Sequence, residues 1–181
     1  MKGIPEKIYT DRLLLRFIRA DDAFNVRSYA CDESINMMMF YPHRTPEETD
    51  EYIKWALSEY EAEEYGTVEY LVEYKGRAVG GVSIDLHENG TAELGWLINQ
   101  KFRSYGIATE AAKALIEVAG KRGVKTVIAR CDSRNTASER VMNKLGMLLI
   151  DDTGVREYPR TGEKSAEKTY ALAMDCKKQY P

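Results

Sequence analysis

The sequence predicts one domain of the α/β (α+β) class, with a mixed, mostly antiparallel sheet of six to seven strands and helices on both faces. Two observations predict this class. Short apolar runs of strand length are separated by glycine-containing turns, and in the second half of the chain such runs alternate with segments of helical spacing. The 181 residues can bury a single core without disulfides. We therefore expect residues 1–181 to form one domain.

Two helices follow the first expected strand, residues 13–18. The first helix begins at the Asp21-Asp22 pair, whose carboxylates suit a helix N-terminus, and runs to about residue 30. The second begins at Thr45-Pro46-Glu47-Glu48, which combines an N-cap threonine, a proline in the first turn and a glutamate at the capping-box spacing. It runs to about residue 63, and its expected buried positions are Ile53, Ala56, Leu57 and Tyr60.

Three strands, a helix, a strand, a helix and two closing strands complete the expected order. The turns at 75–77 and 88–90 contain glycine, so the first three strands are expected to pair as antiparallel hairpins. These strands are expected at 68–74, 78–85 and 91–98, the helices at 109–120 and 135–146, and the other strands at 124–130, 147–158 and 165–174.

Composition argues against membrane, metal and nucleic-acid functions. The sequence has no N-terminal apolar segment of the signal-peptide type and no run near the roughly 18 apolar residues of a membrane helix. Cys31, Cys131 and Cys176 are widely spaced, and His43 and His87 are isolated, which is typical of free thiols in a reducing cytoplasm and not of a metal site. The net charge of -3, with no basic stripe carrying aromatics, argues against nucleic acid.

The charge is unevenly distributed along the chain. Residues 1–100 carry 10 Lys and Arg against 19 Asp and Glu, whereas residues 101–147 carry 10 against 4. A basic block suits a polyanionic ligand, and it is also common on solvated helix surfaces.

The basic block contains a turn suited to pyrophosphate. The residues Arg103-Ser104-Tyr105-Gly106-Ile107-Ala108 lie between an expected strand and a helix that begins near Thr109. Small residues at such a turn let backbone N–H groups approach a ligand, and the helix dipole favours an anion there. Arg103 could add a positive charge at the rim. The alternative is a tight turn that simply needs Gly106.

A second segment, further along the chain, helps to interpret this turn. Residues 135–147 read Asn-Thr-Ala-Ser-Glu-Arg-Val-Met-Asn-Lys-Leu-Gly-Met, a helix led by asparagine. Together the two segments resemble the acetyl-CoA-binding core of the GNAT superfamily of N-acetyltransferases, with its motifs Arg/Gln-x-x-Gly-x-Gly/Ala and Lys-Leu-Gly-Phe. The opening Thr10-Asp11-Arg12-Leu13-Leu14-Leu15-Arg16 resembles the branch that includes the ribosomal-protein alanine acetyltransferases. The resemblance spans about residues 10–175.

The resemblance implies a site for acetyl-CoA. The strand before the turn splays from its neighbour in this family, so its exposed backbone would pair with the pantetheine amides, and one N–H would polarise the acetyl carbonyl. Asn135 would contact the cofactor, with Ser138 beside it, although Asn135 also suits a simple N-cap. The implied cofactor-binding residues are Trp96, Leu97, Ile98, Arg103, Ser104, Tyr105, Gly106, Ile107, Ala108, Thr109, Asn135 and Ser138.

Acetyl transfer to an amine needs a base, and Glu93 is the candidate. Strand alternation places Glu93 on one face with Gly95 and Leu97. The resemblance agrees, because a glutamate two residues before Gly-Tyr/Trp-Leu is often the base in this branch. The alternative is an exposed carboxylate at the end of a strand.

The sequence departs from the family at the usual general acid. Met142 stands where many relatives have a tyrosine, and Met147 replaces the phenylalanine after the helix-ending glycine. Methionine cannot donate a proton. A thiol of pKa ~8.5 can leave as the thiolate, or solvent, Ser138 or a tyrosine (Tyr105, Tyr158 or Tyr170) supplies the proton.

The acceptor is left open by the sequence. Residues 46–64 hold eight Asp and Glu, which fits a cationic acceptor such as a polyamine, an aminoglycoside or a basic peptide N-terminus, and equally fits a solvated helix face. Dimers are common in the superfamily, and no feature decides for or against a homodimer. The leading hypothesis is a cytoplasmic acetyl-CoA-dependent N-acetyltransferase. A non-catalytic acyl-CoA-binding module and a different phosphate-binding protein are the alternatives.

Overall fold

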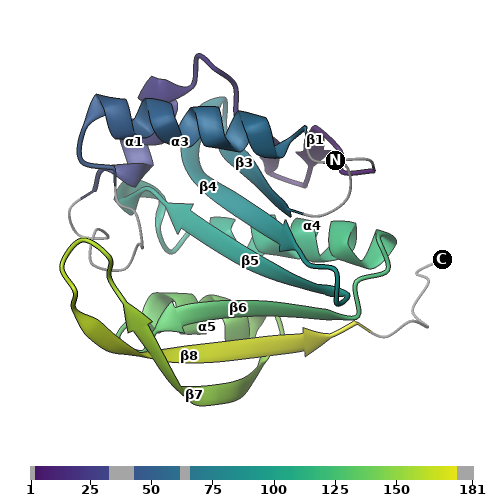
Figure 1. Cartoon of the computed structure of the whole chain (residues 1–181). Coiled ribbons are helices and arrows are strands. Elements are labelled where there is room, and N and C mark those ends of the chain that lie inside the picture. The colour runs from purple at the N-terminus through teal and green to yellow at the C-terminus, as the bar shows by residue number, and fades with distance from the viewer. Residues whose placement is uncertain (1–2, 33–42, 62–65, 175–181) are drawn as a thin grey trace.

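The computed structural model describes residues 3–32, 43–61 and 66–174. These residues form an eight-stranded sheet whose order is β1-β2-β3-β4-β5-β6-β8-β7 (Figure 1). The strands are β1 (Lys7–Tyr9), β2 (Leu13–Phe17), β3 (Gly66–Tyr74), β4 (Arg77–Leu86), β5 (Thr91–Ile98), β6 (Thr126–Asp132), β7 (Leu148–Glu157) and β8 (Lys164–Ala173). The helices are α1 (Ala23–Ala30), α3 (Pro46–Glu59), α4 (Ile107–Lys121) and α5 (Thr136–Lys144), with a short 3-10 turn at Gln100–Phe102.

The predicted fold class and element order are confirmed, with one strand more than expected. Every neighbouring pair in the sheet is antiparallel except β5 and β6, which are parallel. The additional strand is β1, which pairs with β2 in the register Lys7↔Arg16. Three residues are too few to show an alternating pattern, so the sequence did not predict this strand.

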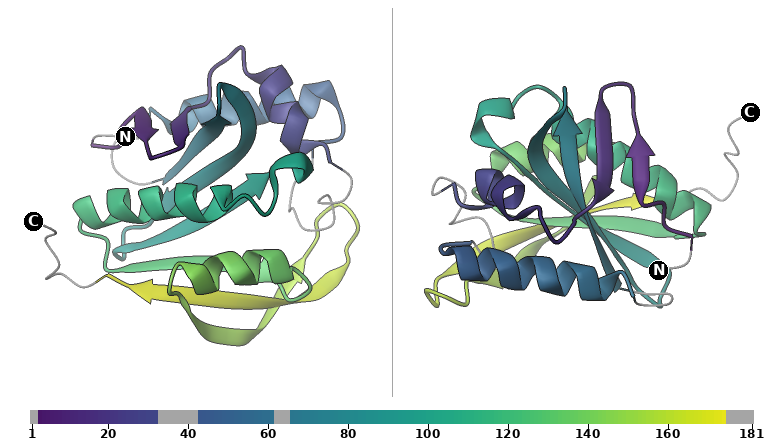
Figure 2. Two further views of the ribbon diagram at one scale, coloured as in Figure 1. Left: turned by 180° about the vertical axis from the view of Figure 1, so that it is seen from behind. Right: turned by 90° about the horizontal axis from the view of Figure 1, so that it is seen from above.

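Helices cover both faces of the sheet, α1 and α3 on one face and α4 and α5 on the other (Figure 2). Strand alternation divides the core accordingly. On β3, Leu71 packs with Val26 and Ile53 under α1 and α3, whereas the neighbouring Tyr70 and Val72 belong to the larger core with α4.

The start of α3 is formed as predicted, and its end comes earlier. The Thr45 side chain accepts a hydrogen bond from the Glu48 N–H at 3.3 Å, with Pro46 in the first turn. Ile53 and Ala56 are buried, while Leu57 and Tyr60 are half-buried. The helix ends at Glu59 and not near residue 63; residues 62–65 lie outside the described chain.

Candidate active site

Strands β5 and β6 form a wedge that opens along the chain direction. Their parallel register covers only Thr91–Glu93 against Thr126–Ile128. Beyond Glu93, β5 continues to Ile98 paired with β4 alone, and the two strands diverge (Figure 1). The backbone of Leu94–Ile98 therefore has one edge without a neighbouring strand, which is the splayed arrangement that the sequence resemblance implies.

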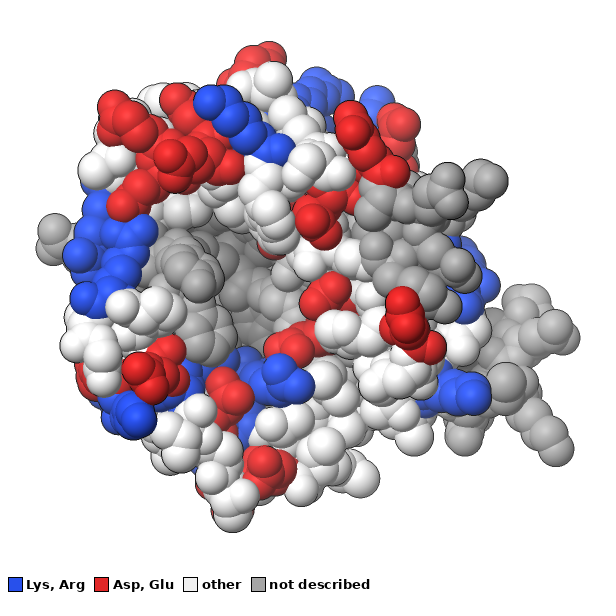
Figure 3. Space-filling model, in the orientation of Figure 1, with Lys and Arg blue, Asp and Glu red and all other residues white. Residues whose placement is uncertain are grey.

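A cavity of about 750 Å³ extends from this wedge across the sheet beneath α1 and α3. It brings together five of the residues predicted to form the site, namely Glu93, Trp96, Leu97, Asn135 and Ser138. On the same face of the molecule, acidic side chains gather over α3 (Figure 3). Ile98 is buried at the end of β5, and the turn residues 103–109 lie outside the cavity lining.

Glu93 is half-buried and faces the cavity, so it is not a freely exposed carboxylate at a strand end. Burial raises its pKa above the usual range of a glutamate, because the charged form loses solvation. The Arg130 guanidinium, 3.0 Å away, opposes this shift. A carboxylate of raised pKa that still has a counter-charge suits a proton acceptor near neutral pH.

The turn before α4 presents its backbone to solvent. Ser104 and Gly106 both adopt positive φ, at 67° and 79°, and no side chain of the described residues caps the helix start. The first-turn N–H groups are thus available to an anion. Arg103 lies differently from the expectation of a free charge at the rim. Its Nε donates to the Ile98 carbonyl at 3.3 Å, and its Nη2 lies 3.6 Å from Asp32, so it folds back on the end of β5.

A clip from the β1–β2 turn holds this turn from outside. Arg12 donates to the Tyr105 carbonyl at 3.1 Å and to Glu110 at 2.7 Å. The Thr10 hydroxyl donates to the same Glu110 carboxylate. The sequence reasoning did not assign these residues a role. The available signal was the place of Thr10 and Arg12 in the segment Thr10–Arg16, which carries part of the family resemblance.

Asn135 caps α5, as the simpler interpretation expected, and also lines the cavity. Its Oδ1 accepts from the Ser138 N–H at 3.0 Å. Met142 is fully buried in the core with α4. Tyr105 is exposed at the turn, Tyr158 donates to Asp132 at 2.7 Å, and Tyr170 is buried. Of the proton donors considered from sequence, Ser138 alone belongs to the cavity lining.

The cavity contains polar residues that the sequence reasoning missed, namely Tyr29 on α1, His43 before α3, Glu69 on β3, Ser83 on β4, Arg130, Arg156 and Arg160. No sequence motif contains them, because they come from segments that are distant in the chain and meet only in the folded structure. From the acidic helix α3, Glu48 and Glu51 line the cavity, as do Tyr52 and Trp55. The acidic residues 63 and 64 lie outside the described chain.

Thiols and metal ligands do not cluster at this site. Cys31 and Cys131 are free, and Cys176 lies outside the described residues. Across residues 3–32, 43–61 and 66–174, no group of three or more His, Cys, Asp or Glu is arranged to hold a metal ion. Within the same ranges, no helix is long and apolar enough to cross a membrane.

Comparison with known proteins shows the family to which the chain belongs. The family model described as an acetyltransferase (GNAT) domain matches residues 12–148. The chain belongs to the GNAT acetyltransferase family. This GNAT protein is accordingly an acyltransferase with acetyl-CoA as the donor. It is 29% identical over 142 residues, 77% of its length and 81% of the relative's, to the uncharacterized N-acetyltransferase YnaD of Bacillus subtilis (strain 168).

Solved structures agree with the fold of this GNAT acetyltransferase. A GNAT-family acetyltransferase from Bacillus anthracis superposes with a TM-score of 0.78 at 26% identity, covering 93% of this chain and 99% of the other. A ribosomal L7/L12 α-N-protein acetyltransferase, RimL, bound to coenzyme A superposes with a TM-score of 0.80 at 20% identity, covering 94% and 99%. The microcin C7 self-immunity acetyltransferase MccE, in complex with acetyl-CoA and AMP, gives 0.82 at 20% identity, covering 94% and 98%.

Proposed function

We propose that this enzyme moves the acetyl group of acetyl-CoA to a primary amine by direct attack, with Glu93 as the general base. One observation carries the proposal: a single cavity joins the open edge of β5 to the half-buried Glu93 carboxylate. The two reactants can therefore meet beside a proton acceptor, and holding them in line removes much of the entropic barrier.

The residues of the wedge and turn fit acetyl-CoA. The unpaired edge of β5 at Trp96–Ile98 supplies backbone groups for the pantetheine amides. The uncapped turn from Arg103 to Thr109, with its two positive φ angles, supplies N–H groups for the pyrophosphate. The side-chain oxygen of Asn135 already caps α5. The amide N–H groups of Asn135 and the hydroxyl of Ser138 are therefore the groups available to a ligand.

In the proposed step, the neutral amine forms a C–N bond to the acetyl carbon as the thioester C–S bond breaks. The proton that the amine loses goes to Glu93, and the sulfur leaves as thiolate or takes a proton from Ser138 or solvent. Backbone N–H groups of β5 polarise the carbonyl oxygen. Acetyl-CoA contributes an activated thioester. The chain positions the two reactants, accepts the proton at Glu93 and polarises the carbonyl with backbone N–H groups.

Thiol release from acetyl-CoA tests the proposal, across a panel of spermidine, tobramycin, an alanine tripeptide and simple alkyl amines. We expect at least one amine to accelerate release, and acetyl-CoA alone to raise the melting temperature. Stabilisation without release for any amine would indicate a non-catalytic binding module. Absence of both effects would indicate a different ligand. The cytoplasmic location and a homodimer stay predictions.

Replacing Glu93 with glutamine tests the base directly. Because the amide cannot accept a proton, E93Q should lower kcat by about 100-fold or more and keep the stabilisation by acetyl-CoA. The matched control is E117Q, an exposed carboxylate on α4 at the opposite face, which should leave kcat unchanged. An E93Q enzyme with full kcat would contradict the assignment.

A further inference from the structure

One end of the cavity is lined by residues that the proposed acetyl-transfer step does not use. This aromatic end consists of Tyr29, His43, Tyr52, Trp55 and Glu69. The rings of His43 and Tyr52 lie 4.7 Å apart between centroids, and those of Tyr52 and Trp55 lie 5.9 Å apart. The Tyr52 side chain also hydrogen-bonds to the Glu69 carboxylate. These contacts join His43, Tyr52, Trp55 and Glu69 into one wall, and Tyr29 lines the same cavity.

Glu69 is a half-buried carboxylate of this cavity that forms no ion pair with a cation of the described residues. Glu93 is paired with Arg130, and Glu48 with Arg160 at 2.8 Å. Glu51 is exposed to solvent. Glu69 is half-buried, and no lysine or arginine of the described chain forms an ion pair with it. Burial raises its pKa to about 7, and the nearby Asp85 carboxylate adds to the rise.

Two further polar groups at this end have unused hydrogen-bonding capacity. The Tyr29 side chain is buried to 3% exposure, and its hydroxyl has no partner among the described residues. The same holds for Nδ1 of the buried His43, and burial lowers the pKa of this imidazole. Buried polar atoms without partners are uncommon in folded proteins. Gly81 keeps the space beside Tyr29 open, since a Cβ there would lie 3.0 Å from the Tyr29 hydroxyl.

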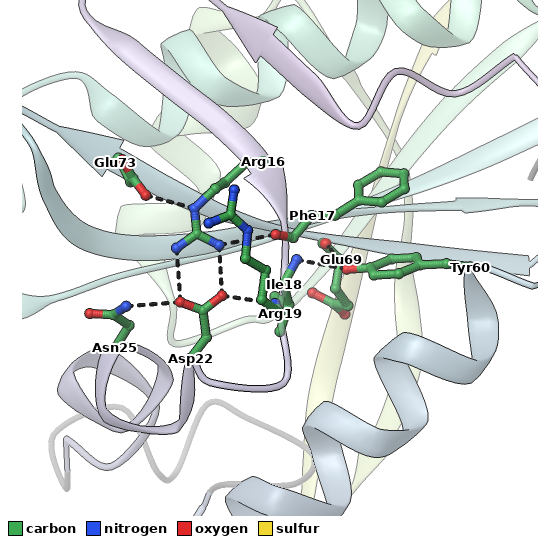
Figure 4. A network of polar contacts seen from close by, with 9 residues as sticks. All are labelled: Arg16, Phe17, Ile18, Arg19, Asp22, Asn25, Tyr60, Glu69 and Glu73. Atoms are coloured by element: carbon green, nitrogen blue, oxygen red, sulfur yellow. Dashed lines mark hydrogen bonds and ion pairs between the residues drawn. The ribbon is translucent and has the colours of Figure 1, made fainter.

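The position of Glu69 is fixed by the surrounding structure. The Tyr60 hydroxyl donates to the Glu69 carbonyl and accepts from the Ile18 N–H at 2.9 Å (Figure 4). The chain beside Ile18 is anchored by the buried Arg16, which binds Asp22 at 2.6 and 2.8 Å and Glu73 at 2.7 Å (Figure 4). A carboxylate on so rigid a strand can select a ligand by distance.

Glu69 and Glu93 occupy separate positions on the floor of the cavity. Glu69 is opposite Ser83, which is opposite Gly95, two residues beyond Glu93. With strands about 4.8 Å apart and a rise of about 3.4 Å per residue, the Cα atoms of the two glutamates are on the order of 12 Å apart. The floor between them is low, because Gly95 has no side chain and its row partner is the small Ser83.

We propose that the acceptor is a dication of the diamine or polyamine class, with its distal ammonium held by Glu69, Tyr29 and the aromatic wall while the reacting amine faces Glu93. The inference rests on the proposed N-acetyltransferase function and names its substrate class. The ammonium supplies the counter-charge that Glu69 lacks, donates to the Tyr29 hydroxyl, and lies against the aromatic rings, which attract cations.

The test compares each diaminoalkane from 1,4-diaminobutane to 1,8-diaminooctane with the monoamine of the same length. In the wild-type enzyme we expect at least one diamine to have a KM at least about tenfold lower than its monoamine. E69Q should remove this preference by raising the KM of the diamine at similar kcat, and E69D should restore part of it. E117Q is the control for the loss of one negative charge and should keep the full preference.

The outcomes separate this inference from the proposed function. Equal KM values for diamines and monoamines in the wild type, or a diamine preference that survives E69Q, would overturn the dication site. If other amines of the panel then still release thiol, the acetyltransferase function stands. A structural role of Glu69 alone would change the kinetics of monoamines and diamines equally, and that result also counts against the proposal.

Discussion

At the scale of single residues, two glutamates of the cavity have similar burial and different partners. Burial raises the pKa of both Glu69 and Glu93, but Glu93 has Arg130 as counter-charge and Glu69 has a tyrosine hydrogen bond. Glu69 therefore reduces the stability of the folded protein unless a ligand cation is present. Sites that bind ligands commonly retain such unfavourable groups.

The cost of Glu69 predicts a pH-dependent effect on stability. Its folded pKa of about 7 exceeds the ordinary value of 4.5, so the folded state binds more protons than the unfolded state between these values. The contribution of Glu69 to the unfolding free energy then falls as pH rises from about 4.5 to 7. We expect the unfolding free energy of E69Q to exceed that of the wild type by on the order of 1 kcal/mol at pH 8, after allowance for the partial exposure of Glu69.

Urea unfolding at pH 5 and pH 8 measures this difference. All other titrating groups are shared by the two proteins, so the change in the difference reports on Glu69. A gap between E69Q and wild type that is the same at both pH values would contradict the shifted pKa.

Cys131 provides a second prediction at this scale. The thiol lines the cavity, and burial raises its pKa to about 11, so it is a poor thiolate nucleophile at neutral pH. C131A should keep kcat within about twofold of the wild type and lose roughly 1 kcal/mol of unfolding free energy for the small cavity created. A complete loss of thiol release in a folded C131A protein would instead require a covalent acetyl-cysteine.

At the scale of elements, the turn before α4 depends on a neighbour far away in the chain. The turn has two residues at positive φ and no cap from its own helix. Arg12 and Thr10 from the β1–β2 turn hold it by binding the Tyr105 carbonyl and Glu110. The order of the turn before ligand arrives therefore comes from this clip, and preorganisation of this kind contributes to affinity.

Removing the clip should weaken acetyl-CoA binding with little effect on folding. The Arg12–Glu110 ion pair is partly exposed, so R12A should cost less than about 1 kcal/mol of unfolding free energy. Loss of the bond to the Tyr105 carbonyl should raise the Kd for acetyl-CoA about fivefold, by calorimetric titration. R77A, which removes an exposed arginine at the start of β4, is the matched control. An equal effect of both variants would mean that the loss of affinity comes from the loss of positive charge in general.

At the scale of the whole molecule, the site belongs to the assembled sheet. The cavity takes residues from α1, α3, β3, β4, β5, β6, α5 and the β7–β8 region. A ligand that occupies the wedge therefore contacts the folded state alone. Binding of this kind shifts the folding equilibrium by mass action.

Acetyl-CoA should accordingly stabilise the entire domain in one transition. At 100 times its Kd, the ligand adds about 2.7 kcal/mol to the unfolding free energy, which corresponds to a rise in Tm of roughly 5–10 °C for a domain of this size. Scanning fluorimetry measures the shift, with adenosine as the control ligand that lacks the pyrophosphate and pantetheine. A rise equally produced by adenosine would show that the turn and wedge do not bind the donor.

The sequence by itself determined the order of the elements, the turn at Gly106 and the helix led by Asn135. These features depend on local chemistry, namely apolar alternation, N-caps and glycine at positive φ, which can be recognised within a few residues. They also sufficed for the family and for the alternation along β5, where Leu97 packs on the side of α1 and α3 and Leu94 and Ile98 pack in the larger core with α4.

Only the tertiary structure decided where β5 leaves β6, that Arg103 folds back on the end of β5 while Arg12 holds the turn, and which residues line the end of the cavity around Glu69. Tyr29, His43 and Glu69 come from three separate segments, and their meaning depends on burial and on the absence of a nearby cation. Burial and counter-charge are properties of contacts between distant parts of the chain, so no local pattern could contain them.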